Sequence, residues 1–273
     1  MGKILIPPGN DILNMRNRIT ELFERKNENI LNVFYTAGFP ELDSTVTVAR
    51  SLAAAGADMI EIGIPFSDPV ADGPTIQASN KVALDNGMTL PLILQQVRSI
   101  RAEGIEIPIL LMGYLNPVMQ YGVEKFVKDA AEAGVDGLIV PDLPVVEYEE
   151  LYQDLFEKHN LCNTFLIAPT TSEARIRKID AATKGFVYAV SASSTTGARQ
   201  GFSQEQLNYF QRLKDMKLAN PVLIGFGISN RDTFSKAASY GAGAIVGSAF
   251  VNRIRDSKDI ASDIASFVSE LKG

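Results

Sequence analysis

The stretch AAAGADMIEIG, residues 53–63, shows the pattern that organises the whole chain. We expect an alanine-rich helix to stop at Gly56, which suits a left-handed C-cap, and a short apolar run follows at 59–63. The same order returns in AAEAGVDGLIVPD at 130–142 and in AASYGAGAIVG at 237–247. Short apolar runs between helices are typical of buried parallel strands, so the repeat predicts alternating strands and helices.

Eight apolar runs predict eight strands, at residues 31–36, 59–63, 107–112, 137–140, 163–168, 185–190, 222–225 and 244–246. Helical patterns follow most of them, at residues 44–55, 90–103, 123–133, 146–159, 172–181, 204–216, 231–239 and 259–271. A helix at 11–26 precedes the first strand, and a short one is expected after Pro74.

Eight strand–helix units in 273 residues predict an α/β fold. The expected fold is a single-domain (β/α)8 TIM barrel that spans residues 1–273 and has an extra N-terminal helix. A doubly wound open sheet is the rival, but no Gly-x-Gly-x-x-Gly turn follows the first strand.

The composition excludes several classes of function. The chain has 26 Lys and Arg against 32 Asp and Glu, a net charge of -6, which disfavours non-specific nucleic-acid binding. One cysteine and one histidine rule out Cys- or His-built metal clusters, so no metal is expected. We interpret His159 as a helix cap and Cys162 as a small buried residue. No apolar run is long enough for a membrane helix, and the cysteine content fits a reducing, cytoplasmic compartment.

Glu61 is the first candidate for chemistry, because barrels of this kind carry their active sites at the C-terminal ends of the strands. It interrupts the apolar run 59–63 and, by strand alternation, faces either the barrel interior or the helix layer. A carboxyl in either place is costly. Glu61 is therefore either paired with a buried lysine or a helix N-terminus, or is a proton-transferring group with a raised pKa.

The loop that follows Glu61, residues 64–74, is stiffened by prolines and carries Asp68 and Asp72. Both aspartates can be explained as ordinary turn or helix-cap residues. For Asp72 we favour the alternative, the second acid of a two-carboxylate acid–base site.

Three late turns predict a phosphate site: TTG at 195–197, GFG at 225–227 and GS at 247–248. Backbone N–H groups near glycine and at helix N-termini bind anions, and barrels hold phosphate after strands seven and eight. The alternative is that these are ordinary tight turns. Tyr188, near the end of strand six, either packs in the core or offers its phenol to the pocket.

Residues 60–77, IEIGIPFSDPVADGPTIQ, resemble the signature of the tryptophan synthase alpha subunit family. The resemblance covers nearly the whole chain and includes FYTAG at 34–38, MGYLNP at 112–117, PDLP at 141–144 and GFGI at 225–228. It implies a barrel lyase that cleaves indole-3-glycerol phosphate to indole and glyceraldehyde 3-phosphate. It also implies a beta subunit, in an alpha2-beta2 heterotetramer, that uses pyridoxal phosphate to join indole to serine, with no cofactor in this chain.

Matched position by position, the resemblance implies that Glu61 and Asp72 are the two catalytic acids. The implied substrate-binding residues are Phe34, Tyr188, Thr196 and Phe226, and the implied phosphate-binding residues are Gly197, Gly227, Gly247 and Ser248. The residues expected to couple the site to the partner are Asp68, Pro69 and Asn116. The chain departs from the family in the lid expected at 191–201, where Ser194-Thr195 stand in place of Gly-Val.

Three other functions stay open at this point. A stand-alone lyase would release free indole, and its turnover would not rise when a beta subunit is added. A catalytically silent subunit would only activate its partner, but it would have no need for Glu61 and Asp72. A barrel enzyme acting on another phosphosugar would turn over substrates that lack indole.

Overall fold

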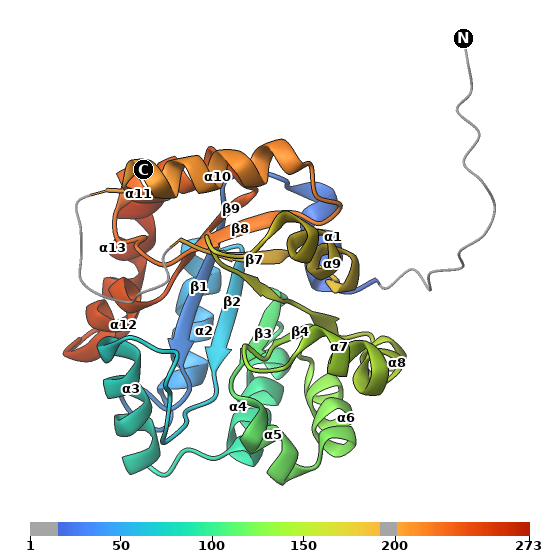
Figure 1. Ribbon diagram of the computed structural model, residues 1–273. Coiled ribbons are helices and arrows are strands. Elements are labelled where there is room, and N and C mark those ends of the chain that lie inside the picture. The colour runs from blue at the N-terminus through green and yellow to red at the C-terminus, as the bar shows by residue number, and fades with distance from the viewer. Residues whose placement is uncertain (1–15, 192–200) are drawn as a thin grey trace.

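Parallel strands surrounded by helices make up the computed structural model, which describes residues 16–191 and 201–273 (Figure 1). The strands are β1 Ile30–Thr36, β2 Met59–Gly63, β3 Ile109–Met112, β4 Gly137–Ile139, β5 Cys162–Asn163, β6 Leu166–Ile167, β7 Val187–Val190, β8 Val222–Gly225 and β9 Gly243–Val246. The helices before β5 are α1 Arg18–Arg25, α2 Ser44–Ala55, α3 Pro74–Asp85, α4 Leu90–Ala102, α5 Leu115–Tyr121, α6 Val123–Ala133, α7 Val145–Glu147, a π-helical turn η1 Tyr148–Tyr152, and α8 Gln153–Lys158. The later helices are α9 Glu173–Ala182, α10 Gln204–Met216, α11 Arg231–Ala238, α12 Ser248–Arg255 and α13 Ile260–Lys272.

The sheet closes on itself through one short segment. Its strand order is β5-β4-β3-β2-β1-β9-β8-β7-β6, so β5 and β6 stand at the two ends. Between them, Thr164 N–H donates to the Leu138 carbonyl at 3.1 Å, and Tyr188 N–H donates to the Phe165 carbonyl at 3.0 Å. Residues 162–167 therefore bond to both neighbours, and the predicted (β/α)8 TIM barrel is confirmed. The fifth strand, predicted as one run at 163–168, is instead split into β5 and β6.

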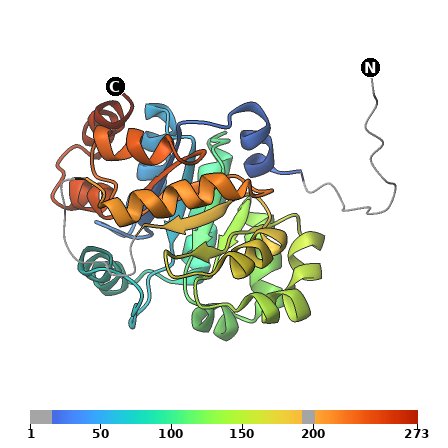
Figure 2. The same cartoon turned by 45° about the horizontal axis from the view of Figure 1, so that its top comes forward.

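Strand alternation divides the apolar residues between two cores. Leu31, Val33 and Tyr35 of β1 point outward and pack with the helices in the larger core. Figure 2 shows these helices placed around the strands. The inward set fills the barrel with Ile30, Met59, Leu110, Ile139, Cys162, Tyr188, Leu223 and Ile245. This division decides which strand residues are able to reach the site.

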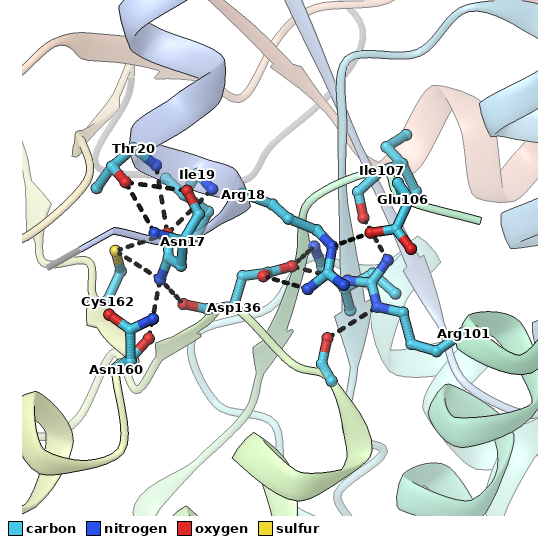
Figure 3. A network of polar contacts seen from close by, with 12 residues as sticks. Asn17, Arg18, Ile19, Thr20, Arg101, Glu106, Ile107, Asp136, Asn160 and Cys162 are labelled. Atoms are coloured by element: carbon cyan, nitrogen blue, oxygen red, sulfur yellow. Dashed lines mark hydrogen bonds and ion pairs between the residues drawn. The ribbon is translucent and has the colours of Figure 1, made fainter. Parts of the chain in front are cut away.

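Helix α1 covers the N-terminal end of the barrel, opposite the strand ends that carry the site (Figure 1). Ile19 and Leu22 are buried with the barrel interior. Asn17 caps the helix and donates its Nδ2 to the carbonyls of Asp136 at 2.8 Å and Asn160 at 3.0 Å (Figure 3). The predicted extra N-terminal helix is therefore present over Arg18–Arg25, and the predicted residues 11–15 lie outside the described part.

Three helical predictions need correction. The helix after Pro74 was expected to be short, but α3 has 12 residues. No helix was predicted between 103 and 123, but α5 lies there, and Pro117 is tolerated in its first turn because its missing N–H would be unpaired anyway. The helix predicted at 146–159 is divided among α7, η1 and α8. Among the described residues, no helix is long and apolar enough to cross a membrane.

Candidate active site

Glu61 lies in the barrel interior, on the same face of β2 as Met59. Its side chain is fully buried, and among the described residues its hydrogen-bond partner is Asn32 rather than a lysine or a helix N-terminus. Asn32 of β1 donates its Nδ2 to Glu61 Oε1 at 2.5 Å, while Oε2 has no partner in the described part of the chain. Burial raises the pKa of Glu61 to about 8, and the hydrogen bond from Asn32 opposes that rise.

Asp72 is half-buried in the loop between β2 and α3. Its N–H donates to the Pro69 carbonyl at 3.0 Å, which holds the loop in a turn. Tyr114, just before α5, donates its hydroxyl to Asp72 Oδ2 at 3.2 Å and accepts the Ala71 N–H at 3.0 Å. Burial raises the pKa of Asp72 to about 6, and the Tyr114 hydrogen bond opposes that rise. The two acids therefore differ in pKa because Glu61 is more deeply buried.

The expected aromatic residues gather around this end of the barrel. Phe34 and Phe226 line the same pocket as Asp72 and Tyr114. Tyr188 packs edge-on against Phe226, with ring centroids 6.4 Å apart. Burial, followed by the charges of Glu61 and Asp72, raises the pKa of Tyr188 well above its ordinary value, so its phenol stays protonated.

Two strand-end glycines make room for these rings. A Cβ added at Gly63 would lie 2.6 Å from the Phe34 ring, and one added at Gly225 would lie 2.6 Å from the Tyr188 ring. Neither contact is possible for a real side chain without movement of the ring. The two glycines therefore allow aromatic side chains to fold over the mouth of the barrel.

The turn after β8 is held in an unusual conformation. Phe226 has φ of 68°, a left-handed value that is uncommon for a bulky residue, and Gly227 follows with φ of 76°. Ser191, after β7, donates its hydroxyl to the Phe226 carbonyl at 2.7 Å and its N–H to the Gly225 carbonyl at 3.0 Å. These bonds from the neighbouring strand end hold the turn in place.

The second expected phosphate-binding turn opens helix α12. Gly247 is its N-cap and Ser248 its first residue, immediately after β9. The unpaired N–H groups of a helix N-terminus favour anions. Gly227 and Gly247 thus follow the adjacent strands β8 and β9. Thr196, Gly197 and most of the expected lid lie outside the described residues.

The residues expected to couple the site to a partner lie in the segments that follow β2 and β3. Asp68 is exposed in the loop after β2 and accepts the Ser67 hydroxyl at 2.5 Å, next to Pro69. Asn116 is exposed in α5, after β3. The same two segments expose large apolar side chains, with Val70 at 88% and Met119 at 59% of their surface.

Sequence reasoning missed two residues of this site, Tyr114 and Asn32. Tyr114 lies inside the family-like stretch MGYLNP, so its place after a strand was the available signal. Asn32 is a polar residue in the otherwise apolar run 30–34, which was a weaker signal of the same kind as Glu61. His159 is the C-cap of α8 and Cys162 is buried, as expected. In the described residues, no group of three or more His, Cys, Asp or Glu side chains is placed to hold a metal ion.

The fold and the site together define an α/β-barrel enzyme equipped for acid–base chemistry. The family model for the tryptophan synthase alpha chain matches residues 21–272. The chain belongs to the tryptophan synthase alpha chain family. Enzymes of this family catalyse the lyase half-reaction of tryptophan synthase, the cleavage of indole-3-glycerol phosphate, and this chain is a lyase of that family.

Individual relatives agree with the family match. The tryptophan synthase alpha chain of Flavobacterium psychrophilum is 51% identical over 255 residues, which cover 93% of this chain and 99% of the relative. That of Parabacteroides distasonis is 50% identical over 256 residues, with 94% and 99% coverage. The solved alpha subunit from Legionella pneumophila has a TM-score of 0.85 at 33% identity and covers 94% of this chain and 97% of its own.

Proposed function

We propose that this chain cleaves indole-3-glycerol phosphate with Glu61 and Asp72 as its two catalytic acids, within one barrel domain. The observation that carries the assignment is a pair of carboxyl groups whose charges both act on Tyr188 and whose own pKa values are raised to about 8 and about 6. Two acids whose environments set different pKa values can hold different protonation states at one pH. Near neutral pH, Glu61 is then protonated and Asp72 is largely ionised.

Glu61 transfers protons in both halves of the reaction. Its carboxylic acid gives a proton to indole C3, which places positive charge on the ring nitrogen. The resulting carboxylate then takes the proton of the glycerol hydroxyl next to C3. The bond between C3 and the glycerol carbon breaks, its electrons return to the ring, and the hydroxyl carbon becomes the aldehyde. The proton lent by Glu61 is thereby recovered, and indole and glyceraldehyde 3-phosphate leave.

Asp72 stabilises the positive charge that develops on the indole N1–H group when C3 is protonated. Tyr114 supports this role because its hydroxyl donates to Asp72 Oδ2 and leaves Oδ1 for the substrate. The hydrogen bond also favours the ionised form of Asp72.

The substrate is held at both of its ends. Phe34, Phe226 and Tyr188 surround the indole ring, with Thr196 as a further contact. The backbone at Gly227 and Gly247, the Ser248 group at the start of α12, and Gly197 bind the phosphate. The support for the phosphate site is the placement of two glycine turns after adjacent strands. Fixing the phosphate orients the scissile bond toward Glu61.

We propose a beta subunit as the partner, assembled with this chain as an alpha2-beta2 heterotetramer in the cytoplasm. Pyridoxal phosphate would belong to that subunit, and this chain would carry no cofactor of its own. Asp68, Pro69 and Asn116 would lie at the contact. The support is their position in the segments that follow β2 and β3, beside the exposed Val70 and Met119.

The decisive experiment adds indole-3-glycerol phosphate to the purified chain and measures indole and glyceraldehyde 3-phosphate in equal amounts. The assay is repeated with a beta subunit, where a large rise in turnover supports the partner-dependent lyase. Unchanged turnover would favour the stand-alone lyase that releases free indole. No indole under either condition would contradict the proposed reaction.

A further inference from the structure

Asn32 and Glu61 form a hydrogen-bonded polar pair inside the barrel. Both side chains are fully buried, and they come from the neighbouring strands β1 and β2. Asn32 Nδ2 donates to Glu61 Oε1 at 2.5 Å. The other two polar atoms of the pair, Asn32 Oδ1 and Glu61 Oε2, have no hydrogen-bond partner among the described residues. One oxygen of the carboxyl group is therefore held, and the other is available.

Packing alone does not account for an asparagine at this position. The residues that share the interior face around it, such as Ile30 and Met59, are apolar. A buried amide with an unpaired oxygen destabilises the fold relative to an apolar residue of similar size. Local rules of this kind are broken mainly at functional sites. The contact of Asn32 with the reactive carboxyl supplies such a function.

We propose that Asn32 is a positioning residue for Glu61, which holds Oε1 so that Oε2 is the oxygen that exchanges protons with the substrate. This inference rests on the proposed function, in which Glu61 is the proton-transferring acid. Asn32 itself touches neither indole nor phosphate in the proposed reaction. It acts by restricting rotation of the carboxyl group and by donating a hydrogen bond to it.

The chemistry of the amide group suits this role. An N–H donor to Oε1 favours the carboxylate and so limits the rise of the Glu61 pKa that burial causes. With Oε1 occupied, the proton of the acid form resides on Oε2, passes to indole C3, and is replaced by the hydroxyl proton. The other titratable groups that influence this end of the barrel are Tyr188 of β7 and Asp72 of the loop after β2. Tyr188 stays protonated, so it does not titrate with Glu61.

The first test compares Asn32→Leu with Asn163→Leu. Asn163 is also buried in the barrel wall, and its Nδ2 has no partner in the part of the chain that the structure describes, but it does not contact Glu61 there. We expect Asn32→Leu to lower kcat by about 10- to 100-fold with KM nearly unchanged, because the acid loses its orientation. The alkaline limb of the kcat–pH profile should move up by about one pH unit, because the donor to the carboxylate is gone. Asn163→Leu should leave both unchanged.

A second variant keeps the inference testable if Asn32→Leu does not fold. Asn32→Asp has the same shape but places a second carboxyl beside Glu61, so the alkaline limb should again move upward. A parental kcat and pH profile in both Asn32 variants, or equal effects in Asn163→Leu, would overturn the inference. Glu61→Gln separates it from the proposed function. Full activity in Glu61→Gln would contradict the assignment of Glu61 as the acid. If Glu61→Gln is inactive while both Asn32 variants behave like the parent, only the role of Asn32 is contradicted.

Discussion

Two buried carboxyl groups occupy opposite ends of the barrel and differ in how they are paired. Asp136, between α6 and β4 at the N-terminal end, is only 2% exposed. It accepts hydrogen bonds from Arg101 Nη2 at 2.7 Å and Arg18 Nη1 at 3.1 Å (Figure 3). It also accepts one from the Ile109 N–H at 2.9 Å. Glu61, at the other end, is fully buried, and Asn32 is its single hydrogen-bond donor within residues 16–191 and 201–273.

The difference separates a structural acid from a reactive one. Burial raises the pKa of Asp136, but the guanidinium groups of Arg101 and Arg18 and the N–H of Ile109 oppose that rise. Its oxygens are occupied, so it has none left for a substrate. Burial raises the pKa of Glu61 to about 8, the hydrogen bond from Asn32 opposes that rise, and Oε2 has no partner among the residues that the structure describes. Depth of burial is similar, and the number of partners decides the role.

Glu61→Gln should have the largest effect on activity. The amide cannot donate and recover the proton, so kcat for indole release should fall by about 10³-fold or more. Thermal unfolding should show a fold at least as stable as the parent. A variant that keeps a tenth of the parental kcat would contradict the assignment of Glu61.

Asp136→Asn should lower the stability of the fold rather than the activity. Removing the charge leaves Arg101 and Arg18 without their shared carboxylate, and breaking a buried ion pair costs about 3–5 kcal/mol. Urea unfolding measures this loss, while kcat per folded molecule should stay at the parental value. Glu103→Gln, which breaks the exposed pair with Arg50, is the matched control and should change stability far less. Equal losses in both variants would remove the structural role of Asp136.

Asp72→Asn should reduce kcat by about 10²-fold, because an amide stabilises less of the positive charge that develops on the ring nitrogen. Binding of a non-cleavable analogue, measured by calorimetry, should change little. Asp85→Asn, an exposed site on the following helix α3, should keep full activity. Normal turnover in Asp72→Asn would assign the stabilisation of N1 to another residue.

The pH dependence of stability should also test whether the pKa of Glu61 is raised in the folded protein. In the unfolded chain Glu61 titrates near 4.5, and in the folded protein near 8. Between these values the folded protein holds a proton that the unfolded chain has lost, so stability falls as pH rises, by up to about 1.4 kcal/mol per pH unit. Glu61→Gln lacks this loss, so its stability relative to the parent should increase between pH 5 and pH 8. A constant difference would show that the pKa is not raised.

Asp68→Ala tests the exposed loop after β2 and should have the smallest effect. Asp68 is exposed four residues before Asp72, so a partner pressing on this loop would reposition the acid. The rate in the presence of a beta subunit should fall about threefold, the scale of an exposed charge contact, and the basal rate should fall less. Asp215→Ala, on the exposed surface of α10, is the control. Equal losses in basal and activated rates would make Asp68 a structural residue.

Much of the site could be found from the sequence because each signal is local. Glu61 breaks an apolar strand, and Asp72 lies in a proline-stiffened loop directly after it. Tyr114 and Asn32 were missed because each acts on a carboxyl group that lies far from it in the sequence. The contact of Tyr114 with Asp72 spans 42 residues, and that of Asn32 with Glu61 spans 29. Nothing in either local pattern indicates the partner.

The alternation of apolar runs with helical segments determined the succession of strands and helices by itself, because burial periodicity is a property of neighbouring residues. The tertiary structure alone decided that Glu61 faces the interior, since strand alternation allows either face until the sheet curls. It also decided that residues 162–167 divide into two strands where the barrel closes. The contrast between Glu61 and Asp136 is likewise visible only in the tertiary structure, because the hydrogen-bond donors to a carboxyl group come from segments distant in the sequence.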